Sequence, residues 1–127
     1  MKGEDNYKVG KTRNQKTGFT GELLARQFFE QKGFEILQTN WRCGHLEIDI
    51  IASRDMVLHI IEVKTQSGRT AGFPEENVNR KKMHNLMKAA EKYMLIENKW
   101  ARVQFDILSV TLYRETNDFF LLEDVYF

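Results

Sequence analysis

The segment that most constrains the fold of this chain is a run of apolar residues over 57–65. Apolar side chains fall on both faces of an extended strand here: Val57, Leu58, Ile60, Ile61 and Val63. Such a strand is typical of the middle of a sheet that other elements cover on both sides. Two further strand candidates precede it, at 34–41 and 47–53, and Arg54 with Asp55 makes a tight connection between the last two. We therefore predict a β-meander whose third strand is central.

Segments of helical periodicity flank this meander in the sequence. Residues 18–32 place their large apolar side chains on one broad face and end at Gly33, a natural left-handed stop. A second helix is expected from Pro74 to about Asn98, with one apolar stripe and with most of its lysines and arginines facing outward. Both helices therefore offer one apolar face to a sheet.

Two strands are expected to close the sheet, at 102–112 and 119–127. A polar turn that contains Asn117 and Asp118 connects them. The predicted order is helix, three strands, helix, two strands. Because the second helix connects strands, we predict a mixed β-sheet flanked by helices, which is the α/β class.

Length and composition fit a single domain. The chain has 127 residues, of which 42% are hydrophobic and 29% charged, with one proline, so a disordered or repetitive chain is excluded. We expect a flexible basic arm over 1–16 and one domain over 17–127. No apolar stretch approaches the roughly 18 residues that cross a bilayer. Cys43 is the single cysteine, so neither an internal disulfide nor a four-cysteine zinc site can form. A soluble cytoplasmic protein without a membrane partner is the expectation.

Charged side chains interrupt two of the apolar strands at matching places. Glu47 and Asp49 are two positions apart and share one face of their strand. Glu62 and Lys64 repeat that spacing on the next strand. If the two strands pair as a hairpin, up to three carboxylates and one ammonium meet on one face of the sheet. Ionised groups in such surroundings are costly unless they are paired, hydrogen-bonded, hydrated or bound to a metal.

A divalent cation, Mg²⁺ or Mn²⁺, satisfies this requirement. Mg²⁺ takes carboxylate and carbonyl oxygens at about 2.1 Å and keeps several waters. We therefore predict Asp49 and Glu62 as its anchors and the Val63 carbonyl as a further ligand. Such an ion polarises a phosphodiester and lowers the pKa of an attacking water, so hydrolysis is the predicted reaction class. Lys64 is expected to stay protonated beside the carboxylates and to stabilise negative charge or orient the water. The alternative is an ion pair of Lys64 with one of these carboxylates that only holds the strands together.

Residues over most of the chain resemble a known family. The matching positions run from the first helix through the strands: Gly18, Gly21, Glu22, Ala25, Gly33, Phe34, Ile36, Leu37, Asn40, Arg42, Glu47, Ile48, Asp49, Glu62, Val63, Lys64, Lys82, Leu86, Ala89, Ala90, Phe105 and Asp106. This succession resembles the YraN-like, largely uncharacterised endonuclease-like family. The resemblance implies a restriction-endonuclease-like core in which Asp49, Glu62 and Lys64 match the divided acidic and E-x-K motif. It also implies an acidic position on the first helix, matched by Glu22.

Three positions depart from the pattern of that family. Leu46 stands where a glycine is usual before the acidic strand. Gln66 stands where an arginine commonly follows the E-x-K motif, and Gln104 replaces another arginine. Two cationic groups and one flexible backbone position are replaced, so we expect phosphate affinity or site geometry to differ. The proposed metal anchors are retained.

Three further carboxylates have two interpretations each. Glu22 could hold a second metal or a metal-bound water, or it could pair with Arg26 or cap the backbone. Glu47 could support the metal or form a salt bridge within the hairpin. For Asp106, structural pairing is favoured over metal ligation, and His59 is interpreted as a structural histidine.

Cationic residues near the predicted site are candidates for contacts with phosphates. Arg80, Lys81 and Lys82 lie at the start of the second helix, and Arg42 lies at the end of the first strand. Solvation of a charged surface is the alternative for each. Trp41 is interpreted as packing at a strand end rather than as a base-stacking residue.

The leading hypothesis is a Mg²⁺- or Mn²⁺-dependent nuclease that hydrolyses phosphodiesters in DNA, with branched, flapped or damaged DNA as candidate substrates. A homodimer is compatible with two-strand cleavage. Two other classes stay open: a nucleic-acid-binding module of the same fold that cleaves nothing, and a protein-interaction scaffold whose charged strand residues form only salt bridges. Zinc binding by Cys43 and His45 is disfavoured because further ligands are missing.

Overall fold

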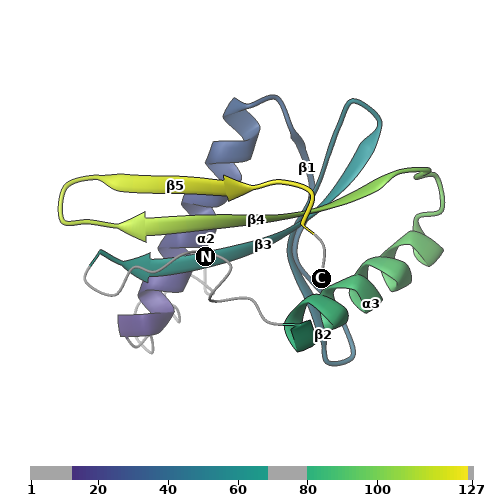
Figure 1. Ribbon diagram of the computed structural model, residues 1–127, viewed down its shortest axis with the longest axis horizontal. Coiled ribbons are helices and arrows are strands. Elements are labelled where there is room, and N and C mark those ends of the chain that lie inside the picture. The colour runs from purple at the N-terminus through teal and green to yellow at the C-terminus, as the bar shows by residue number, and fades with distance from the viewer. Residues whose placement is uncertain (1–12, 69–79, 126–127) are drawn as a thin grey trace, which may run out of the picture.

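The structure is a computed structural model that describes residues 13–68 and 80–125. Its elements follow along the chain as α2 (Arg13–Gln31), β1 (Glu35–Cys43), β2 (Leu46–Arg54), β3 (Val57–Ser67), α3 (Arg80–Ile96), β4 (Val103–Leu112) and β5 (Asn117–Leu122). The described strands form one sheet in the order β1-β2-β3-β4-β5 (Figure 1). The predicted α/β class and the predicted order of helices and strands are confirmed.

β3 is the middle strand of the sheet. It pairs antiparallel with β2 and parallel with β4, and the outer pairs β1–β2 and β4–β5 are antiparallel. Residues 58–63 of β3 are all buried, because other elements cover both of its faces. The predictions of a β-meander and of a central third strand are confirmed.

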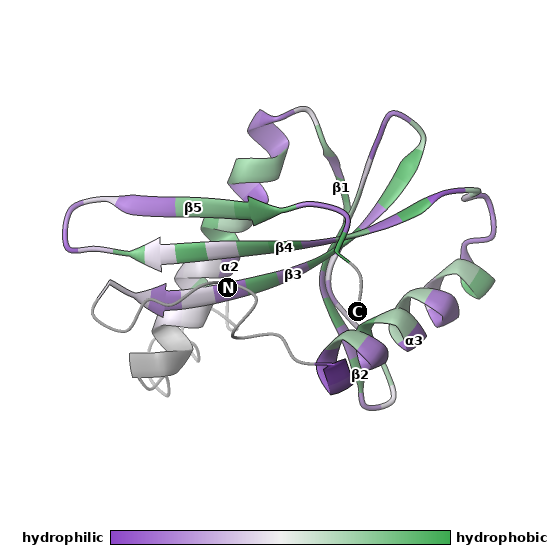
Figure 2. Ribbon diagram, viewed as in Figure 1, coloured by the Kyte–Doolittle hydropathy of each residue, from purple (hydrophilic) through white to green (hydrophobic). Residues whose placement is uncertain are grey.

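The two described helices cover opposite faces of the sheet. α2 packs Ala25 and Phe29 against a cluster that includes Ile61 and Leu108. α3 packs on the other face, mainly over β2, through Met83, Leu86, Ala89, Ala90 and Tyr93. Hydrophobic and hydrophilic bands alternate along α3, as its amphipathic pattern requires (Figure 2). Neither described helix has the length and apolar character needed to span a bilayer.

β2 and β3 diverge before their ends. Their ladder runs from Arg54↔Val57 to Ile50↔Ile61, and beyond that point, among the described strands, β2 pairs with β1 alone and β3 with β4 alone. Figure 1 shows the β1–β2 hairpin turning away from β3, β4 and β5 toward α3. The next residue on each strand is a carboxylate, Asp49 on β2 and Glu62 on β3. The divergence therefore separates the two strands at the predicted site.

α2 begins earlier than the sequence predicts. α2 begins at Arg13, so residues 13–16 of the expected arm belong to the helix. The rest of that arm and the predicted helix start at Pro74 lie outside the described residues. α3 is described from Arg80 and ends at Ile96, close to the predicted end.

The last hairpin differs from the prediction. Asn117 and Asp118 are strand residues that pair with β4, and the turn lies at 113–116, where the Tyr113 amide donates to the Thr116 carbonyl at 2.9 Å. β5 ends at Leu122, well before the predicted end at 127. Asp124 has a φ of 56°, a left-handed conformation that an extended strand does not contain. The predicted turn was wrong because polar residues typical of turns here lie on an exposed edge strand.

Candidate active site

The carboxylate of Asp49 bridges the opening between β2 and β3. Asp49 Oδ2 accepts a hydrogen bond from the Val63 amide of β3 at 2.8 Å. Glu62 follows Ile61, the last residue of β3 that is paired with β2. The structure thus brings the two predicted metal anchors to the same end of the ladder.

Val63 turns its backbone toward Asp49. A strand residue directs its N–H and its C=O to the same side, and the Val63 N–H points at Asp49. The Val63 carbonyl therefore faces the opening rather than β4. It lies on the side where the predicted third metal ligand is needed.

Two lysines approach one oxygen of Glu62, which is buried with 5% of its surface exposed. The Nζ atom of Lys82 lies 2.7 Å from Glu62 Oε2, and the Nζ atom of Lys64 lies 3.5 Å from the same oxygen. The ion pair that is the alternative role for Lys64 is therefore present. Lys82 was predicted only as a phosphate-binding residue, and α3 places it against the carboxylate as well.

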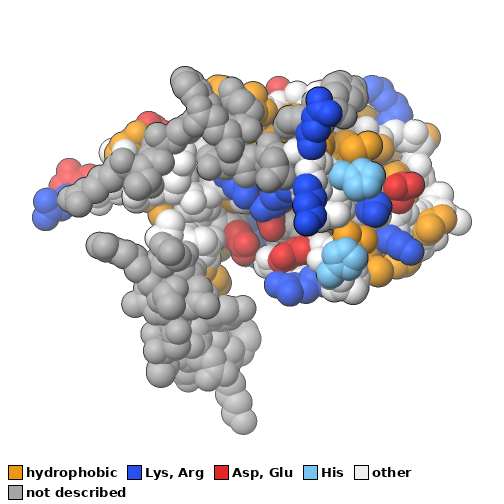
Figure 3. Space-filling model, turned by 60° about the horizontal axis from the view of Figure 1, so that its bottom comes forward, with side chains coloured by type: hydrophobic (Ala, Val, Ile, Leu, Met, Phe, Trp, Pro, Cys, Tyr) orange, Lys and Arg blue, Asp and Glu red, His pale blue; other side chains and the backbone are white. Residues whose placement is uncertain are grey.

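These residues surround a pocket of about 510 Å³ between α2, β2, β3 and α3. Its lining is mostly charged or polar: Glu22, His45, Leu46, Glu47, Asp49, Glu62, Val63, Lys81, Lys82, Asn85 and Leu86. On the face shown in Figure 3, acidic side chains gather beside lysine and arginine side chains. All four predicted catalytic carboxylates line this pocket, and Lys64 contacts it through Glu62.

The pKa of Asp49 is raised to about 8. Burial is the main cause, and the negative charge of Glu62 adds to it, as do those of Glu22 and Glu47. The hydrogen bond from Val63 acts in the opposite direction. Desolvation and like charges both disfavour the ionised carboxylate, so Asp49 is mostly protonated at neutral pH when no cation balances the site.

The two lysines beside Glu62 have pKa values shifted in opposite directions. Burial lowers the pKa of Lys64, and the neighbouring Lys82 lowers it further, against the attraction of Glu62. Burial also lowers the pKa of Lys82, but hydrogen bonds with Glu62 and Lys64 and the attraction of the carboxylates outweigh it, so this pKa is raised. Glu62 favours protonated Lys64, as expected, but burial and the second lysine lower the pKa of Lys64 from its ordinary value.

A close approach of α2 to β3 brings Glu22 to the pocket. A Cβ atom at Gly21 would overlap the Thr65 hydroxyl oxygen and lie 2.6 Å from the Thr65 Cβ. Only glycine allows the helix to come this near the strand. Glu22 is the next residue, and its charge reaches Asp49, whose pKa it raises.

The oxygen ligands at this end of the ladder fit a hard divalent cation. Asp49, Glu62 and the Val63 carbonyl are ligands of the type that Mg²⁺ and Mn²⁺ take, with waters and substrate oxygens completing the shell. The repulsion that raises the pKa of Asp49 is what a bound cation relieves. Within the described ranges, no group of three or more His, Cys, Asp or Glu side chains converges as a metal site. The candidate site is therefore an open one with two protein carboxylates.

Two of the four predicted phosphate-binding residues line the pocket. Lys81 and Lys82 line it from the start of α3, whereas Arg80 lines a separate hollow together with Lys81. Arg42 forms an ion pair with Glu47, with 3.3 Å between Nη2 and Oε2. The hairpin salt bridge that was one interpretation of Glu47 is thus present, and both residues are exposed.

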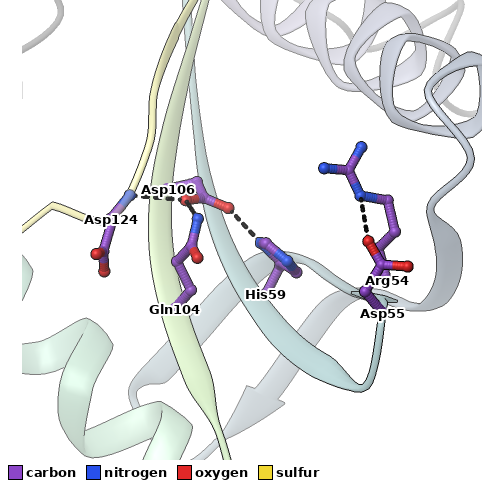
Figure 4. A network of polar contacts seen from close by, with 6 residues as sticks. All are labelled: Arg54, Asp55, His59, Gln104, Asp106 and Asp124. Carbon is purple, nitrogen blue, oxygen red and sulfur yellow. Dashed lines mark hydrogen bonds and ion pairs between the residues drawn. The ribbon is translucent and has the colours of Figure 1, made fainter.

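Asp106 belongs to a buried network outside the pocket (Figure 4). Its Oδ2 lies 2.7 Å from His59 Nδ1. Its Oδ1 accepts hydrogen bonds from Gln104 Nε2 at 2.9 Å and from the Asp124 amide at 3.0 Å. The structural pairing that the sequence favours for Asp106 is present, and Gln104, one of the three departures from the family pattern, takes part in it.

Two other residues singled out in the sequence have packing roles. Leu46, which replaces a glycine of the family pattern, is buried in the core cluster beneath α3. Trp41 packs edge-on against Tyr93, with 5.5 Å between ring centroids, as predicted.

Some residues of the pocket were not predicted. Asn85 and Leu86 lie three and four residues after Lys82, and this helical spacing places them on the same face. The helical spacing from Lys82 is therefore the sequence signal from which Asn85 and Leu86 could have been predicted as pocket residues. His45 lines the pocket from the β1–β2 turn, although the sequence suggested it only as a weak zinc ligand.

Fold and pocket together define a mixed α/β protein with carboxylates and lysines gathered where two central strands diverge. The chain belongs to the uncharacterised protein family UPF0102, whose model matches residues 21–110. A UPF0102 protein of Flavobacterium psychrophilum is 39% identical over 102 residues, which cover 80% of this chain and 84% of the relative. A UPF0102 protein of Clostridium perfringens is 33% identical over 107 residues, which cover 84% and 88%. The predicted family resemblance is confirmed, and the matched range includes every predicted site residue.

Proposed function

We propose that the chain is a divalent-metal-dependent nuclease that hydrolyses phosphodiester bonds in DNA. The observation that carries the proposal is the meeting of Asp49 and Glu62 at the open end of a strand ladder, with two lysines against Glu62. Carboxylates and lysines in one pocket can combine metal binding, charge stabilisation and proton transfer. Because the family is uncharacterised, the support comes from this pocket and from the resemblance to the divided acidic and E-x-K motif.

In this proposal Asp49 and Glu62 hold the metal, and the Val63 carbonyl is a third ligand. When bound, Mg²⁺ or Mn²⁺ polarises the phosphodiester and lowers the pKa of the attacking water. Glu22 and Glu47 line the same pocket and orient water molecules by accepting their hydrogen bonds.

Lys64 and Lys82 take different tasks because their pKa values move apart. Lys82 keeps its ammonium and neutralises a phosphate oxygen. Lys64 is the better proton acceptor of the two and takes the proton of the attacking water. The water oxygen bonds to phosphorus, one ester P–O bond breaks, and the leaving oxygen takes a proton from solvent. The products are a phosphate monoester and a free hydroxyl group.

The cations around the pocket fit a DNA backbone. Lys81 and Lys82 line the pocket, and Arg42 lines an adjoining one. Phosphate contacts of this kind position a substrate without reading its sequence. Branched, flapped or damaged DNA is the candidate substrate, and the cytoplasm is the proposed location.

The test is cleavage of labelled duplex, single-stranded, flap and four-way DNA by the purified chain in Mg²⁺, Mn²⁺ or EDTA. Asp49→Asn removes a metal anchor and Lys64→Ala removes the proton acceptor. Glu91→Gln and Lys88→Ala change exposed residues of α3 of the same charge and serve as matched controls. We expect metal-dependent products that fall about 100-fold or more in the first two variants and are unchanged in the controls.

Other outcomes contradict the proposal. DNA binding without products in any metal would leave a nucleic-acid-binding module, and the absence of both binding and products would favour a protein-interaction scaffold. Products that persist in Asp49→Asn would show that a contaminant, or a different centre, cuts the DNA.

A further inference from the structure

A second pocket adjoins the first on the other side of the carboxylates. It has a volume of about 690 Å³ and lies between α2 and the β1–β2 hairpin. Glu22, Glu47 and Asp49 line both pockets. The two hollows therefore meet at these three carboxylates. The second pocket is called the α2–β1 groove below.

Away from the three shared carboxylates, the α2–β1 groove combines positive charge with exposed apolar surface. Arg26 of α2 and Arg42 of β1 supply a guanidinium group from each wall. Phe19 and Leu23 lie one helical turn apart on α2 and expose 47% and 42% of their surface. Asn40 adds an exposed amide from β1. Arginine side chains beside an exposed aromatic ring are a combination that binds unpaired nucleotides.

Positive charges lie on both sides of the three shared carboxylates. Lys81 and Lys82 line the pocket at α3, and Arg26 and Arg42 line the α2–β1 groove, where Arg42 also pairs with Glu47. A polynucleotide carries one negative charge on every phosphate. A strand laid across both pockets would meet cations on either side of the phosphate that lies at the carboxylates. This arrangement of charged side chains suits an extended polynucleotide strand better than a compact ligand.

We infer that the α2–β1 groove holds the unpaired nucleotides next to the phosphate that is cut, so that the substrate is a single strand or the single-stranded arm of a branched molecule. This inference rests on the proposed function, because the carboxylates mark the position of that phosphate. In a duplex, neighbouring bases cover the base faces, whereas an unpaired base offers its face to Phe19. The volume of the groove lies within the range of small-ligand pockets, about 300–1,000 Å³.

Equilibrium binding by the Asp49→Asn protein in Mg²⁺ tests the groove separately from cleavage. Asn keeps an oxygen for the Val63 amide and leaves the Phe19 ring and the two arginines of the groove in place. The probes are fluorescent oligothymidylate and oligouridylate of about 10 nucleotides and a blunt DNA duplex. Phe19→Ala removes the ring, Phe19→Tyr keeps it, and Phe120→Ala removes a ring of similar exposure, 51%, on β5 as the matched control.

We expect the single strands to bind more tightly than the duplex. Phe19→Ala should weaken single-strand binding about 10-fold, with a change of less than about twofold for the duplex. Phe19→Tyr should restore the affinity and Phe120→Ala should leave it unchanged. A loss in the DNA arm, the RNA arm or both supports the groove and identifies the sugar that it accepts. Circular dichroism melts check that each variant is folded.

Equal affinity for single strands and duplex would overturn the inference, as would an equal loss of both in Phe19→Ala. Metal-dependent cleavage of duplex by the unmodified chain, undiminished by Phe19→Ala, would reject the groove and keep the proposed nuclease. Failure of the proposed nuclease has a different signature: no cleavage in any metal while single-strand binding still depends on Phe19.

Discussion

Asp49 links pH to stability through one side chain. Its pKa is raised from the ordinary value of 3.8 to about 8, because the carboxylate is buried among other carboxylates. The folded chain therefore holds a proton at this position that the unfolded chain loses more easily. The resulting contribution to stability is complete below about pH 4 and is lost as the pH rises through about 8.

Asp49→Asn is expected to remove this pH dependence, because asparagine keeps the acceptor for the Val63 amide and cannot ionise. In EDTA at about pH 8.5 the variant should be more stable by about 2 kcal/mol, a rise in Tm of about 5–10 °C. The difference should shrink as the pH falls toward about 4. Thermal melts across this range measure it, and a difference that does not vary with pH contradicts the raised pKa.

Replacing Lys64 and replacing Lys82 should have different kinetic effects, because the pKa of Lys64 is lowered and that of Lys82 is raised. Lys64→Ala should lower kcat about 100-fold with little change in KM. Lys82→Ala should raise KM about 10-fold and reduce the salt dependence of binding, because it removes a phosphate-neutralising charge. Steady-state kinetics on a flap substrate separate the two. Equal losses in kcat would contradict the assigned roles.

At the level of elements, the docking of α2 depends on the glycine that faces Thr65. Gly21→Ala should destabilise the chain by about 1–3 kcal/mol, because its Cβ overlaps the Thr65 side chain. Gly18 lies in the same helix with open space around it, so Gly18→Ala should stabilise by about 0.5–1 kcal/mol. Urea unfolding gives both values. Thr65→Gly should recover part of the loss in Gly21→Ala, and the same sign for both alanine variants would show that α2 does not approach β3 in this way.

The network around Asp106 connects β3, β4 and the segment after β5. Asp106→Ala leaves His59 and the Asp124 amide without their acceptor and should cost about 2–4 kcal/mol of stability. Its affinity for Mn²⁺, measured by calorimetry on the folded variant, should be unchanged because Asp106 does not line the pocket. A loss of Mn²⁺ affinity would instead support the metal-ligand interpretation of Asp106.

The periodicity of strands explains how much of the molecule the sequence predicts. Side chains two positions apart in a strand lie on the same face of the sheet. The spacing of Glu47 with Asp49 and of Glu62 with Lys64 therefore predicts a common site without knowledge of how the helices pack on the sheet. Strand ends are less predictable: β5 ends at Leu122, and the left-handed conformation of Asp124 keeps the chain from continuing as a strand to 127. The contact of Lys82 with Glu62 and the α2–β1 groove depend on where the helices pack, and no local pattern encodes that.

At the scale of the whole molecule, the sheet divides into two parts that meet at the candidate site. The β1–β2 hairpin lies mainly beneath α3, and β3 with β4 lies beneath α2. Asp49 belongs to one part and Glu62 to the other. Beyond the last ladder pair, the hydrogen bond from Val63 to Asp49 connects them.

Binding of one ion by both carboxylates should therefore fasten the two parts together. We expect Mg²⁺ to slow exchange of the Val63 amide hydrogen about 10-fold, because opening of the strands would have to release the ion. The Leu58 amide, which donates to the Arg102 carbonyl at the other end of β3, should be unaffected. Hydrogen exchange followed by NMR tests this. The same slowing in Asp49→Asn would rule out a shared ion as its cause.

Because β2 and β3 diverge at the candidate site, core packing beneath α3 affects the distance between the β1–β2 hairpin and β3. Met83 of α3 and Ile51 of β2 pack in one core cluster, while Lys82, the residue before Met83, contacts Glu62 of β3. α3 therefore contacts both diverging strands. Adding or removing a methylene group in the core beneath α3 would therefore change the distance between the carboxylates of Asp49 and Glu62. Such a core substitution would change which divalent cation the site prefers without replacing a metal ligand.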